Sequence, residues 1–569
     1  MKDRLEIAAD LRAIANLLRI KGENPFKAQA YERGADALEN LEGDLNTLVR
    51  QRRLKELAGI GTALAAAIEE IHDTGECWLL HQLREELPRG AVELSKIPGL
   101  SLKKIVALDE ALHIETIADL KSACQEGLVR KVKNFGLKSQ AKLLADIENF
   151  ETPKDGFLLL DAAMDEANRI MKHLHSCGQL IKADVAGAVR RRKETIRKID
   201  IIAASDRPKA VLDQFLRYPA LARTDELDDF HCDARLASGV RAEVVLVGRD
   251  DFIAALHART GSGKHIEKLR HLAREQRIDL LSGQPGNCTE PHIKEESEIY
   301  GRLGLQYIAP ELREDQGEIE AARSGTLPQP VAVEDIRGMT HCHTVYSDGR
   351  STIEEMALAA EAMGMTYLTI TDHSQTAYYA RGIGADRLRA QWDEIARVQE
   401  RVKIKILKGT ESDILADGSL DYPDHLLERF DIIIASIHAR HKMDSKQMTE
   451  RLLRALKLPL FKIWGHPLGR LLQSRPPFEC RIEEVIDAIA EAKCAIEVNG
   501  DPRRLDLEPR WIRAARTRGI KFIVSTDAHS TGGLKNLPYG IAMARRGWLA
   551  RGDVLNTLEA EDFMHSVHP

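Results

Sequence analysis

Nine histidine, aspartate and glutamate residues stand at or just after the ends of apolar runs in the C-terminal part of the chain. They are His341, His343, Asp348, His373, Glu411, His438, His466, Asp527 and His529. Imidazole and carboxylate groups without cysteine suit Zn²⁺, Mn²⁺ or Fe²⁺, and a set of this size can hold more than one ion. Such a centre lowers the pKa of bound water to roughly 7 and binds the oxygens of a phosphoryl displacement. We therefore predict a metal centre that hydrolyses phosphoesters.

Strand-like and helical patterns alternate after residue 337 and would position these side chains. The strand-like runs are 337–343, 366–373, 403–411, 431–438, 461–466, 495–499 and 521–529. These βα units predict a distorted parallel barrel, in which chemistry lies at the carboxyl ends of the strands. Every run except 495–499, which ends at Asn499, supplies a candidate ligand. A lone histidine is usually structural, but so many ligands at one rim are improbable by chance.

Length, charge and cysteine content limit the remaining possibilities. A chain of 569 residues is too long for one core, so about three to five domains are expected. The formal charge of -6 means that any nucleic-acid surface is local. No apolar run approaches membrane length, and eight cysteines without a CxxC pair predict reduced thiols and a cytoplasmic protein.

Residues 1–150 show helical periodicity throughout. Two segments within them, 57–71 and 97–112, place a short glycine-containing turn before a helix and resemble helix-hairpin-helix motifs; 132–144 is a looser candidate. In that motif Gly59, Gly61 and Gly99 would let backbone N–H groups approach DNA phosphates. Any tight connection between helices also uses glycine, so one such turn alone has a structural explanation.

Residues 155–316 mix helices with short β-rich runs and predict an α+β region, followed by a linker at 317–336. If 196–202 is a strand, alternation puts Lys198 and Asp200 on one face with Ile202. A metal site would need two carboxylates there. The stretch is therefore an active site, a former active site or a solvated charged strand.

The C-terminal motifs resemble those of PHP-domain metallohydrolases. They are HCHTVYSDG (341–349), TDHS (371–374), GTESDI (409–414), ASIHAR (435–440), WGHPLGRLL (464–472) and TDAHS (526–530). The resemblance implies three ions: one on His341, His343, Glu411 and Asp527, one on Glu411, His438 and His466, and one on Asp348, His373 and His529. It implies catalytic roles for Glu411, His438 and Arg440. Arg440 and Arg470 would bind substrate phosphate, or are simply surface arginines near strand ends.

The rest of the chain resembles bacterial family X DNA polymerases that carry a C-terminal PHP domain. NPFKAQAYERGADAL (24–38) is similar to their N-terminal helical domain, and LGLQYIAPELREDQGEIEAA (303–322) to the end of their thumb. The resemblance implies an N-terminal helical domain (1–85), a fingers-like domain (86–150), a palm-like domain (151–248), a thumb-like domain (249–316) and a PHP domain (337–569). It also implies gapped or 3′-end-containing DNA as partner and a nuclease that trims 3′ ends with Mn²⁺.

The palm-like motifs depart from those of the family. GAVRR (187–191) keeps Gly187, Arg190 and Arg191 but has Ala188 where relatives have a phosphate-binding serine. Lys198 replaces the first aspartate of the catalytic pair, Asp200 keeps the second, and Glu243 stands at the third position. Ala258 and Arg259 replace an aromatic pair, and Ala67 and Ala63 replace the lysines associated with lyase activity. Two-metal nucleotidyl transfer needs three carboxylates, so we interpret this site as a former polymerase site.

These observations predict a DNA-binding 3′ to 5′ exonuclease with up to three Mn²⁺ or Zn²⁺ ions, fused to a polymerase-like region that no longer polymerises. Arg190 and Arg191 would keep contacts to DNA phosphates. We expect a monomer without membrane attachment. The alternatives are an active gap-filling polymerase with exonuclease activity, a phosphatase of the histidinol-phosphatase type, and a non-catalytic scaffold for DNA ends.

Overall fold

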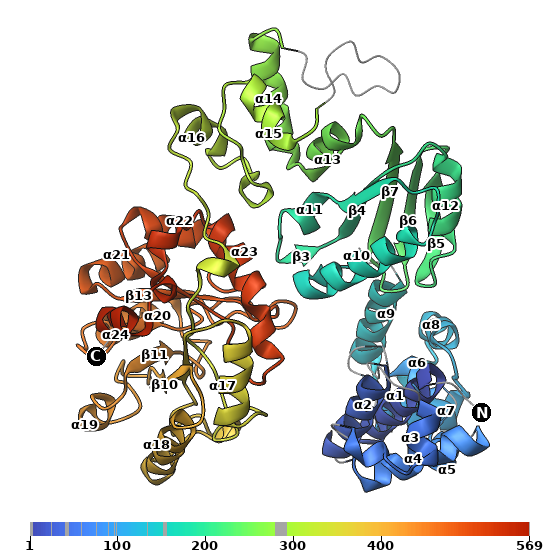
Figure 1. Cartoon of the computed structure of the whole chain (residues 1–569). Helices are drawn as coiled ribbons and strands as arrows, with labels where there is room; N and C mark the ends of the chain where they lie inside the picture. The colour runs from blue at the N-terminus through green and yellow to red at the C-terminus, as the bar shows by residue number, and fades with distance from the viewer. Residues whose placement is uncertain are drawn as a thin grey trace. The chain divides into compact units, whose positions relative to one another are not determined.

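The chain folds into two compact units, Met1–Lys154 and Asp155–Pro569 (Figure 1). The computed structural model describes residues 4–567, except for 24, 40–44, 58–59, 76, 89, 96, 98–99, 134, 152–155 and 279–292. Among the described residues, no helix combines the length and apolar character needed to span a membrane.

Helices make up the described part of the first unit. They are α1 (Arg4–Lys21), α2 (Pro25–Glu39), α3 (Leu45–Arg50), α4 (Thr62–Thr74), α5 (Trp78–Glu86), α6 (Ala91–Leu94), α7 (Leu102–Leu112), α8 (Ile117–Gln125) and α9 (Leu137–Glu151). On α1 the apolar residues at three and four spacing, Ile7, Leu11, Ile14 and Leu18, are all fully buried. The prediction of a helical N-terminal region is therefore confirmed.

The second unit begins with the palm-like domain, built on a five-stranded sheet in the order β2-β4-β7-β6-β5. Its strands are β2 (Lys182–Val185), β4 (Lys198–Ala204), β5 (Leu221–Leu227), β6 (His231–Leu236) and β7 (Arg241–Val247), beside a short pair β1 (Leu158–Leu159) and β3 (Thr195–Ile196). The helices are α10 (Leu160–His175), α11 (Gly187–Arg190) and α12 (Pro208–Leu216). Alternation along β4 is as predicted: Ile199 and Ile201 join one core, and Ile202 joins another with Phe252.

The thumb-like domain consists of α13 (Phe252–Thr260), α14 (Gly263–Glu275), α15 (Glu296–Arg302) and α16 (Glu318–Ser324). The last helix lies inside the segment 317–336 that we expected to be a linker. Ile319 and Ala322 pack in the same core as Leu269 and Tyr300, which stabilises this helix. The extended connection therefore begins only after Gly325, whose positive φ of 71° ends α16.

The C-terminal domain is the predicted seven-stranded parallel barrel. Its order is β14-β13-β12-β11-β10-β9-β8, and the strands are β8 (Gly338–Met339), β9 (Tyr367–Ile370), β10 (Lys405–Asp413), β11 (Ile432–Ser436), β12 (Ile463–Trp464), β13 (Ala495–Asn499) and β14 (Phe522–Ser525). Beyond the first and last strands, Cys342 pairs with Ala528 in a parallel bridge. This bridge brings the two edges of the sheet together, so the barrel is nearly closed.

Helices surround these strands (Figure 1). They are α17 (Ile353–Ala362), α18 (Ala385–Gln399), α19 (Asp424–Leu427), α20 (Ser445–Ala455), α21 (Ile482–Ala492), α22 (Pro509–Thr517), α23 (Leu537–Arg546) and α24 (Ala560–Val567). Side chains inside the barrel form a core that includes Leu407, Ile432, Ile434 and Ile523. Residues farther along the same strand faces point to the carboxyl-terminal rim.

Candidate functional site

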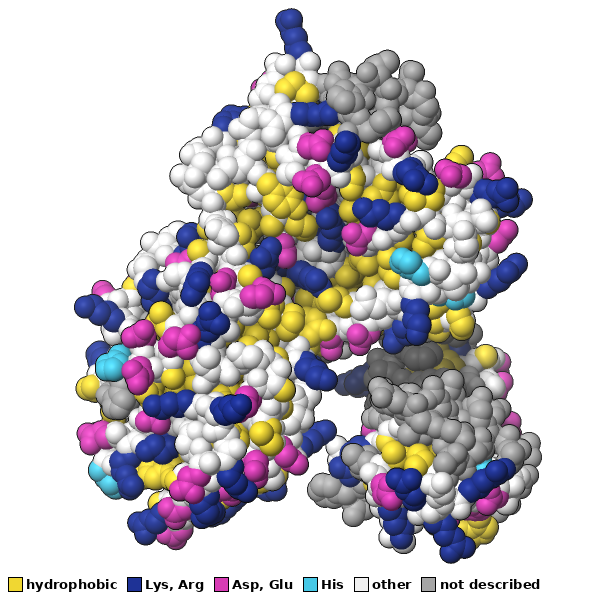
Figure 2. Space-filling model, in the orientation of Figure 1, with side chains coloured by type: hydrophobic (Ala, Val, Ile, Leu, Met, Phe, Trp, Pro, Cys, Tyr) yellow, Lys and Arg dark blue, Asp and Glu magenta, His cyan; other side chains and the backbone are white. Residues whose placement is uncertain are grey.

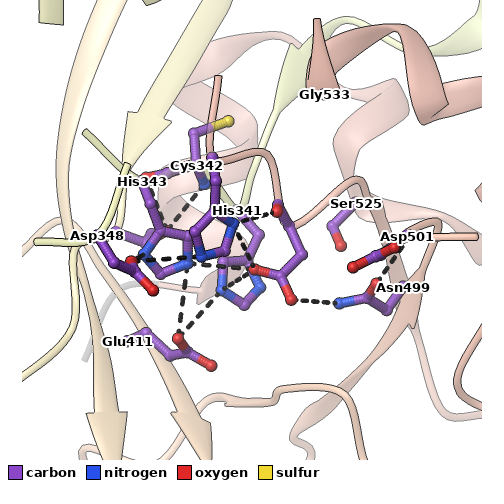
Figure 3. A network of polar contacts seen from close by, with 12 residues as sticks. His341, Cys342, His343, Asp348, Glu411, Asn499, Asp501, Ser525 and Gly533 are labelled. Atoms are coloured by element: carbon purple, nitrogen blue, oxygen red, sulfur yellow. Dashed lines mark hydrogen bonds and ion pairs between the residues drawn. The ribbon is translucent and has the colours of Figure 1, made fainter. Parts of the chain in front are cut away.

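Strand alternation places the predicted ligands at one rim of the barrel. Glu411 is four residues after Leu407, and His438 is four residues after Ile434, so each continues a face that lines the barrel interior. Asp527 follows Ile523 at the same spacing. Figure 3 shows His341, His343, Asp348 and Glu411 directed toward one another.

Glu411 lies between two groups of imidazoles. Its Oε2 atom is 3.5 Å from His341 Nε2 and 3.6 Å from His343 Nε2. Its Oε1 atom is 2.7 Å from His466 Nε2 and 3.1 Å from His438 Nε2. One carboxylate therefore faces both of the predicted ion positions, as a bridging ligand must.

The remaining candidates complete the predicted groups. Asp527 Oδ1 is 3.2 Å from His343 Nε2. Asp348 Oδ1 lies 3.3 Å from His529 Nε2 and 3.7 Å from His373 Nε2. The structure thus brings all nine candidate ligands into one cluster.

Several buried atoms in this cluster have no hydrogen-bond partner. They are His341 Nε2, both ring nitrogens of His343, His373 Nδ1, Glu411 Oε2 and His466 Nδ1. Leaving such groups buried and unpaired costs about 1–3 kcal/mol each. His341, His343, His373 and Glu411 belong to groups whose ligand atoms lie within 4.8 Å of one another, so divalent cations there would satisfy both vacant lone pairs and buried negative charge.

The pKa values of two histidines in this cluster reflect the same excess of negative charge. Burial opposes protonation of His438, but Glu411 and Asp413 outweigh it and raise its pKa to about 10. Burial likewise opposes protonation of His529, and Asp348 and Asp527 raise its pKa to about 9. Protons on these rings therefore balance the carboxylates and would leave when metal binds.

Sequence reasoning missed Glu497 on β13. This fully buried carboxylate accepts a hydrogen bond of 2.6 Å from His341 Nδ1 and one of 2.5 Å from Ser525 Oγ. It thereby fixes the His341 ring so that Nε2 points at the cluster. The signal was present, because a glutamate in the apolar run AIEVN shares a strand face with Asn499 at the rim.

Two further carboxylates orient the loops that carry ligands. Asp372 accepts hydrogen bonds from Thr344 N at 2.7 Å and Gln391 Nε2 at 2.6 Å, and this anchors the loop leading to Asp348. Asp413 bonds to His438 Nδ1, which directs Nε2 of that ring toward Glu411. Neither aspartate was predicted.

The two arginines suggested for phosphate binding differ in their surroundings. Arg440 is exposed and its backbone is left-handed, with φ of 59°. Arg470 is buried; its Nε donates to the carbonyl of Arg504 at 2.9 Å, and its guanidinium lies 3.6 Å from both Glu194 and Glu508. Arg440 can reach a substrate at the surface, whereas Arg470 is already paired.

In the palm-like domain, Lys198 joins the two remaining carboxylates. Its Nζ atom lies 2.7 Å from Asp200 Oδ1 and 2.8 Å from Glu243 Oε2. Glu243 also contacts Arg259 at 3.0 Å and His231 at 2.9 Å. The ammonium group therefore occupies the space between the carboxylates.

The surrounding motif keeps its backbone but not its polar contacts. Gly187 has φ of 58°, and a Cβ there would lie 2.0 Å from Asp200 Oδ2, so only glycine fits. Ala188 is half-buried and offers no hydroxyl. Ala258 and Arg259 line a cavity of about 370 Å³ beside the sheet.

The proposed DNA contacts are only partly described. Gly59 and Gly99 lie outside the described residues, whereas Gly61 precedes α4 with open space around its Cα. Arg190 forms two hydrogen bonds to Glu296, at 2.7 and 2.9 Å, and Arg191 bonds to Glu314 at 2.9 Å.

Charge is distributed evenly over the surface seen in Figure 2, where lysine and arginine side chains are interspersed with aspartate and glutamate. A broad basic field is absent from the described residues on that face. This pattern agrees with the net charge of -6 and with a local nucleic-acid surface.

Three domain families match the chain: a helix-hairpin-helix domain at residues 2–77, a DNA polymerase beta thumb at 255–314 and a PHP domain at 340–501. The DNA polymerase/3′-5′ exonuclease PolX of Bacillus subtilis (strain 168) is 35% identical over 558 residues, 97% of each chain. The probable phosphatase Teth514_1060 of Thermoanaerobacter sp. (strain X514) is 30% identical over 38% of this chain and 89% of its own length. A probable phosphatase of Acetivibrio thermocellus is 30% identical over 33% of this chain and 78% of its own length. End-to-end similarity and the order of the domains show that the chain belongs to the bacterial family X DNA polymerases that carry a C-terminal PHP domain.

Proposed function

We propose that this protein is a metal-dependent 3′ to 5′ DNA exonuclease that trims DNA 3′ ends during repair. The observation that carries the proposal is Glu411, whose two oxygens face separate groups of imidazoles at the barrel rim. The Bacillus subtilis relative is named for the same activity. The helix-hairpin-helix and thumb domains support DNA as the partner.

The nine rim side chains would hold two or three Mn²⁺ or Zn²⁺ ions. Such ions supply an activated water and stabilise charge on the phosphoryl oxygens. Glu497 and Asp413 fix the tautomers and orientations of His341 and His438. Exposed Arg440 would bind a backbone phosphate as the strand enters.

The palm-like domain would hold DNA without extending it. Lys198 contributes one positive charge within hydrogen-bond distance of both Asp200 and Glu243. A divalent ion at the same place would meet that charge at ligand distance, where repulsion is several kcal/mol even at an effective dielectric constant of 20. Nucleotidyl transfer is therefore not expected from this site. Because Arg190 and Arg191 are paired with glutamates, phosphate binding would depend on the exposed basic groups nearby.

A second candidate is hydrolysis of small phosphate monoesters. The two relatives that cover 38% and 33% of this chain are named probable phosphatases. The two functions differ in substrate. A phosphatase prefers a terminal phosphate on a small molecule, whereas the exonuclease cleaves the phosphodiester that links the last nucleotide to a DNA strand.

The deciding experiment uses the full chain with Mn²⁺ on a gapped duplex whose primer carries a 5′ label. We expect a ladder of shortened primers, and no extension when dNTPs are added. Glu411→Gln should abolish shortening while the far-ultraviolet circular dichroism spectrum stays unchanged. Undiminished cleavage by the folded Glu411→Gln protein would contradict the metal assignment.

The same substrates test the loss of synthesis. Lys198→Asp should not restore primer extension, because Ala188, Ala258 and Arg259 still lack contacts that relatives make. Extension by the unmodified protein would contradict the proposal for the palm-like domain. Faster release of phosphate from small monoesters than cleavage of DNA would favour the phosphatase.

A further inference from the structure

Two adjacent tyrosines stand exposed beside the metal-binding rim. The side chains of Tyr378 and Tyr379 are 86% and 66% exposed, although both are large and partly apolar. They belong to a short helical turn, Tyr378–Ala380, in the loop that follows the candidate ligand His373. No described residue forms a hydrogen bond with either hydroxyl group.

The loop that carries the tyrosines is held in a defined shape. Ala377 and Ala380 are fully buried on either side of them. Thr376 N donates to Asp421 at 2.7 Å, and Ile383 N donates to the carbonyl of His373 at 2.9 Å. Because the flanking residues are anchored, the fold holds the turn that carries the two tyrosines in place.

Tyr379 is close to ligands from two of the three predicted groups. Its ring centroid lies 5.9 Å from that of His373, in an edge-on arrangement, and 6.1 Å from that of His438. An exposed aromatic face thus stands beside two side chains that would hold the metal ions acting on the reacting phosphate.

We propose that Tyr379, assisted by Tyr378, stacks on the base of the 3′-terminal nucleotide and so holds that nucleotide at the metal-binding rim. The inference rests on the proposed exonuclease activity and defines its substrate more closely. Stacking needs only an aromatic face, tolerates every base and stabilises binding to single strands.

Terminal nucleotides with and without a base provide the test. Single-stranded oligonucleotides end either in thymidine or in an abasic tetrahydrofuran residue, and both are offered to the full chain with Mn²⁺. Stacking is worth roughly a 5- to 150-fold preference for the end with a base. Tyr379→Ala should remove most of that preference by raising KM for the thymidine end, with kcat little changed. Tyr379→Phe should keep it, since the ring remains.

Controls separate stacking from stability and from the activity itself. Phe230→Ala removes another exposed aromatic ring, 53% exposed on the palm-like domain, and should leave the preference intact. An Mn²⁺ affinity of Tyr379→Ala equal to that of the unmodified protein, measured by calorimetry, would show that its metal centre is intact. A preference that persists in both Tyr379→Ala and the double variant with Tyr378→Ala overturns the inference. No cleavage of either end by the unmodified protein overturns the exonuclease proposal itself.

Discussion

Replacing Lys198 with methionine should destabilise the palm-like domain locally. Methionine keeps a long unbranched side chain but removes the ammonium that lies 2.7 Å from Asp200 and 2.8 Å from Glu243. The two carboxylates then face each other with only Arg259 and His231 beside Glu243. We expect the free energy of opening of β4 and β7 to fall.

The size of the effect follows from the burial of the three groups. Breaking a buried ion pair costs about 3–5 kcal/mol, whereas an exposed pair contributes below about 1 kcal/mol. Lys198 is 32% exposed, and the side chains of Asp200 and Glu243 are 12% and 8% exposed. An intermediate value of about 2 kcal/mol is therefore expected, which corresponds to roughly 30-fold faster exchange of protected amides.

The loss of stability caused by Lys198→Met should grow with pH. Burial raises the pKa of Asp200 to about 6 despite Lys198, and removal of the ammonium raises it further. A carboxyl group with a raised folded-state pKa destabilises the fold when charged, and protonation removes that cost. Burial also opposes ionisation of Glu243, but Lys198 and Arg259 hold its pKa at about 2, and the stability this provides is lost only in strong acid. The Asp200 effect makes the Lys198→Met deficit larger at pH 8 than at pH 5, whereas the Glu243 effect is the same at both pH values.

Hydrogen–deuterium exchange measured by mass spectrometry can resolve this effect peptide by peptide. Both proteins are compared at each pH, so the intrinsic pH dependence of exchange cancels. Peptides covering 198–204 and 241–247 should lose protection, while those covering 495–499 in the barrel should not. Equal protection in the two proteins, or a deficit that is the same at pH 5 and pH 8, would refute the idea that Lys198 neutralises this pair.

Three other predictions concern the barrel and the helical unit. Glu497→Gln weakens the hydrogen bond that orients His341, so Mn²⁺ affinity should fall roughly 10- to 100-fold in calorimetry; an unchanged affinity would contradict that role. Because the pKa of His438 is about 10, Mn²⁺ binding at pH 7 should release protons, which calorimetry in buffers of different ionisation enthalpy detects; a binding enthalpy independent of buffer would count against it. Deleting residues 1–154, a separate compact unit, should weaken DNA binding and reduce its salt dependence; an equal salt slope would exclude the unit as a DNA contact.

The sequence was most informative where periodicity and chemistry coincided. Each predicted barrel strand is present. In a parallel barrel, an apolar run that ends at a polar ligand fits a strand, because the run is buried in the core and the ligand lies at the carboxyl-terminal rim. The same alternation located Lys198 and Asp200 on one face of β4. The strand face on which a side chain lies depends only on local backbone geometry, so the neighbouring residues are enough to predict it.

Features that depend on distant partners could not be predicted in the same way. Arg470 sits in a motif beside the ligand His466, yet its side chain pairs with Glu194, which lies far away in sequence. Helix α16 forms within a region of weak periodicity because the thumb-like core covers Ile319 and Ala322. The sequence places Glu497 on a strand face that leads to the rim, but only its contact with His341 shows which ligand it orients.

Both sites of this chain balance buried carboxylates with positive charge, but they do so in different ways. In the palm-like domain the positive charge belongs to Lys198, which is covalently attached and cannot be exchanged for a divalent ion without displacing its side chain. At the barrel rim, Glu411 and Asp527 are balanced by protons on imidazoles such as His438, and those protons can leave when metal arrives. A second group that could hold a cation, His231, Asp233 and Glu243, lies in the palm-like domain, but there Lys198 is already 2.8 Å from the glutamate. We therefore propose the metal-dependent chemistry for the PHP domain and DNA holding for the polymerase-like region.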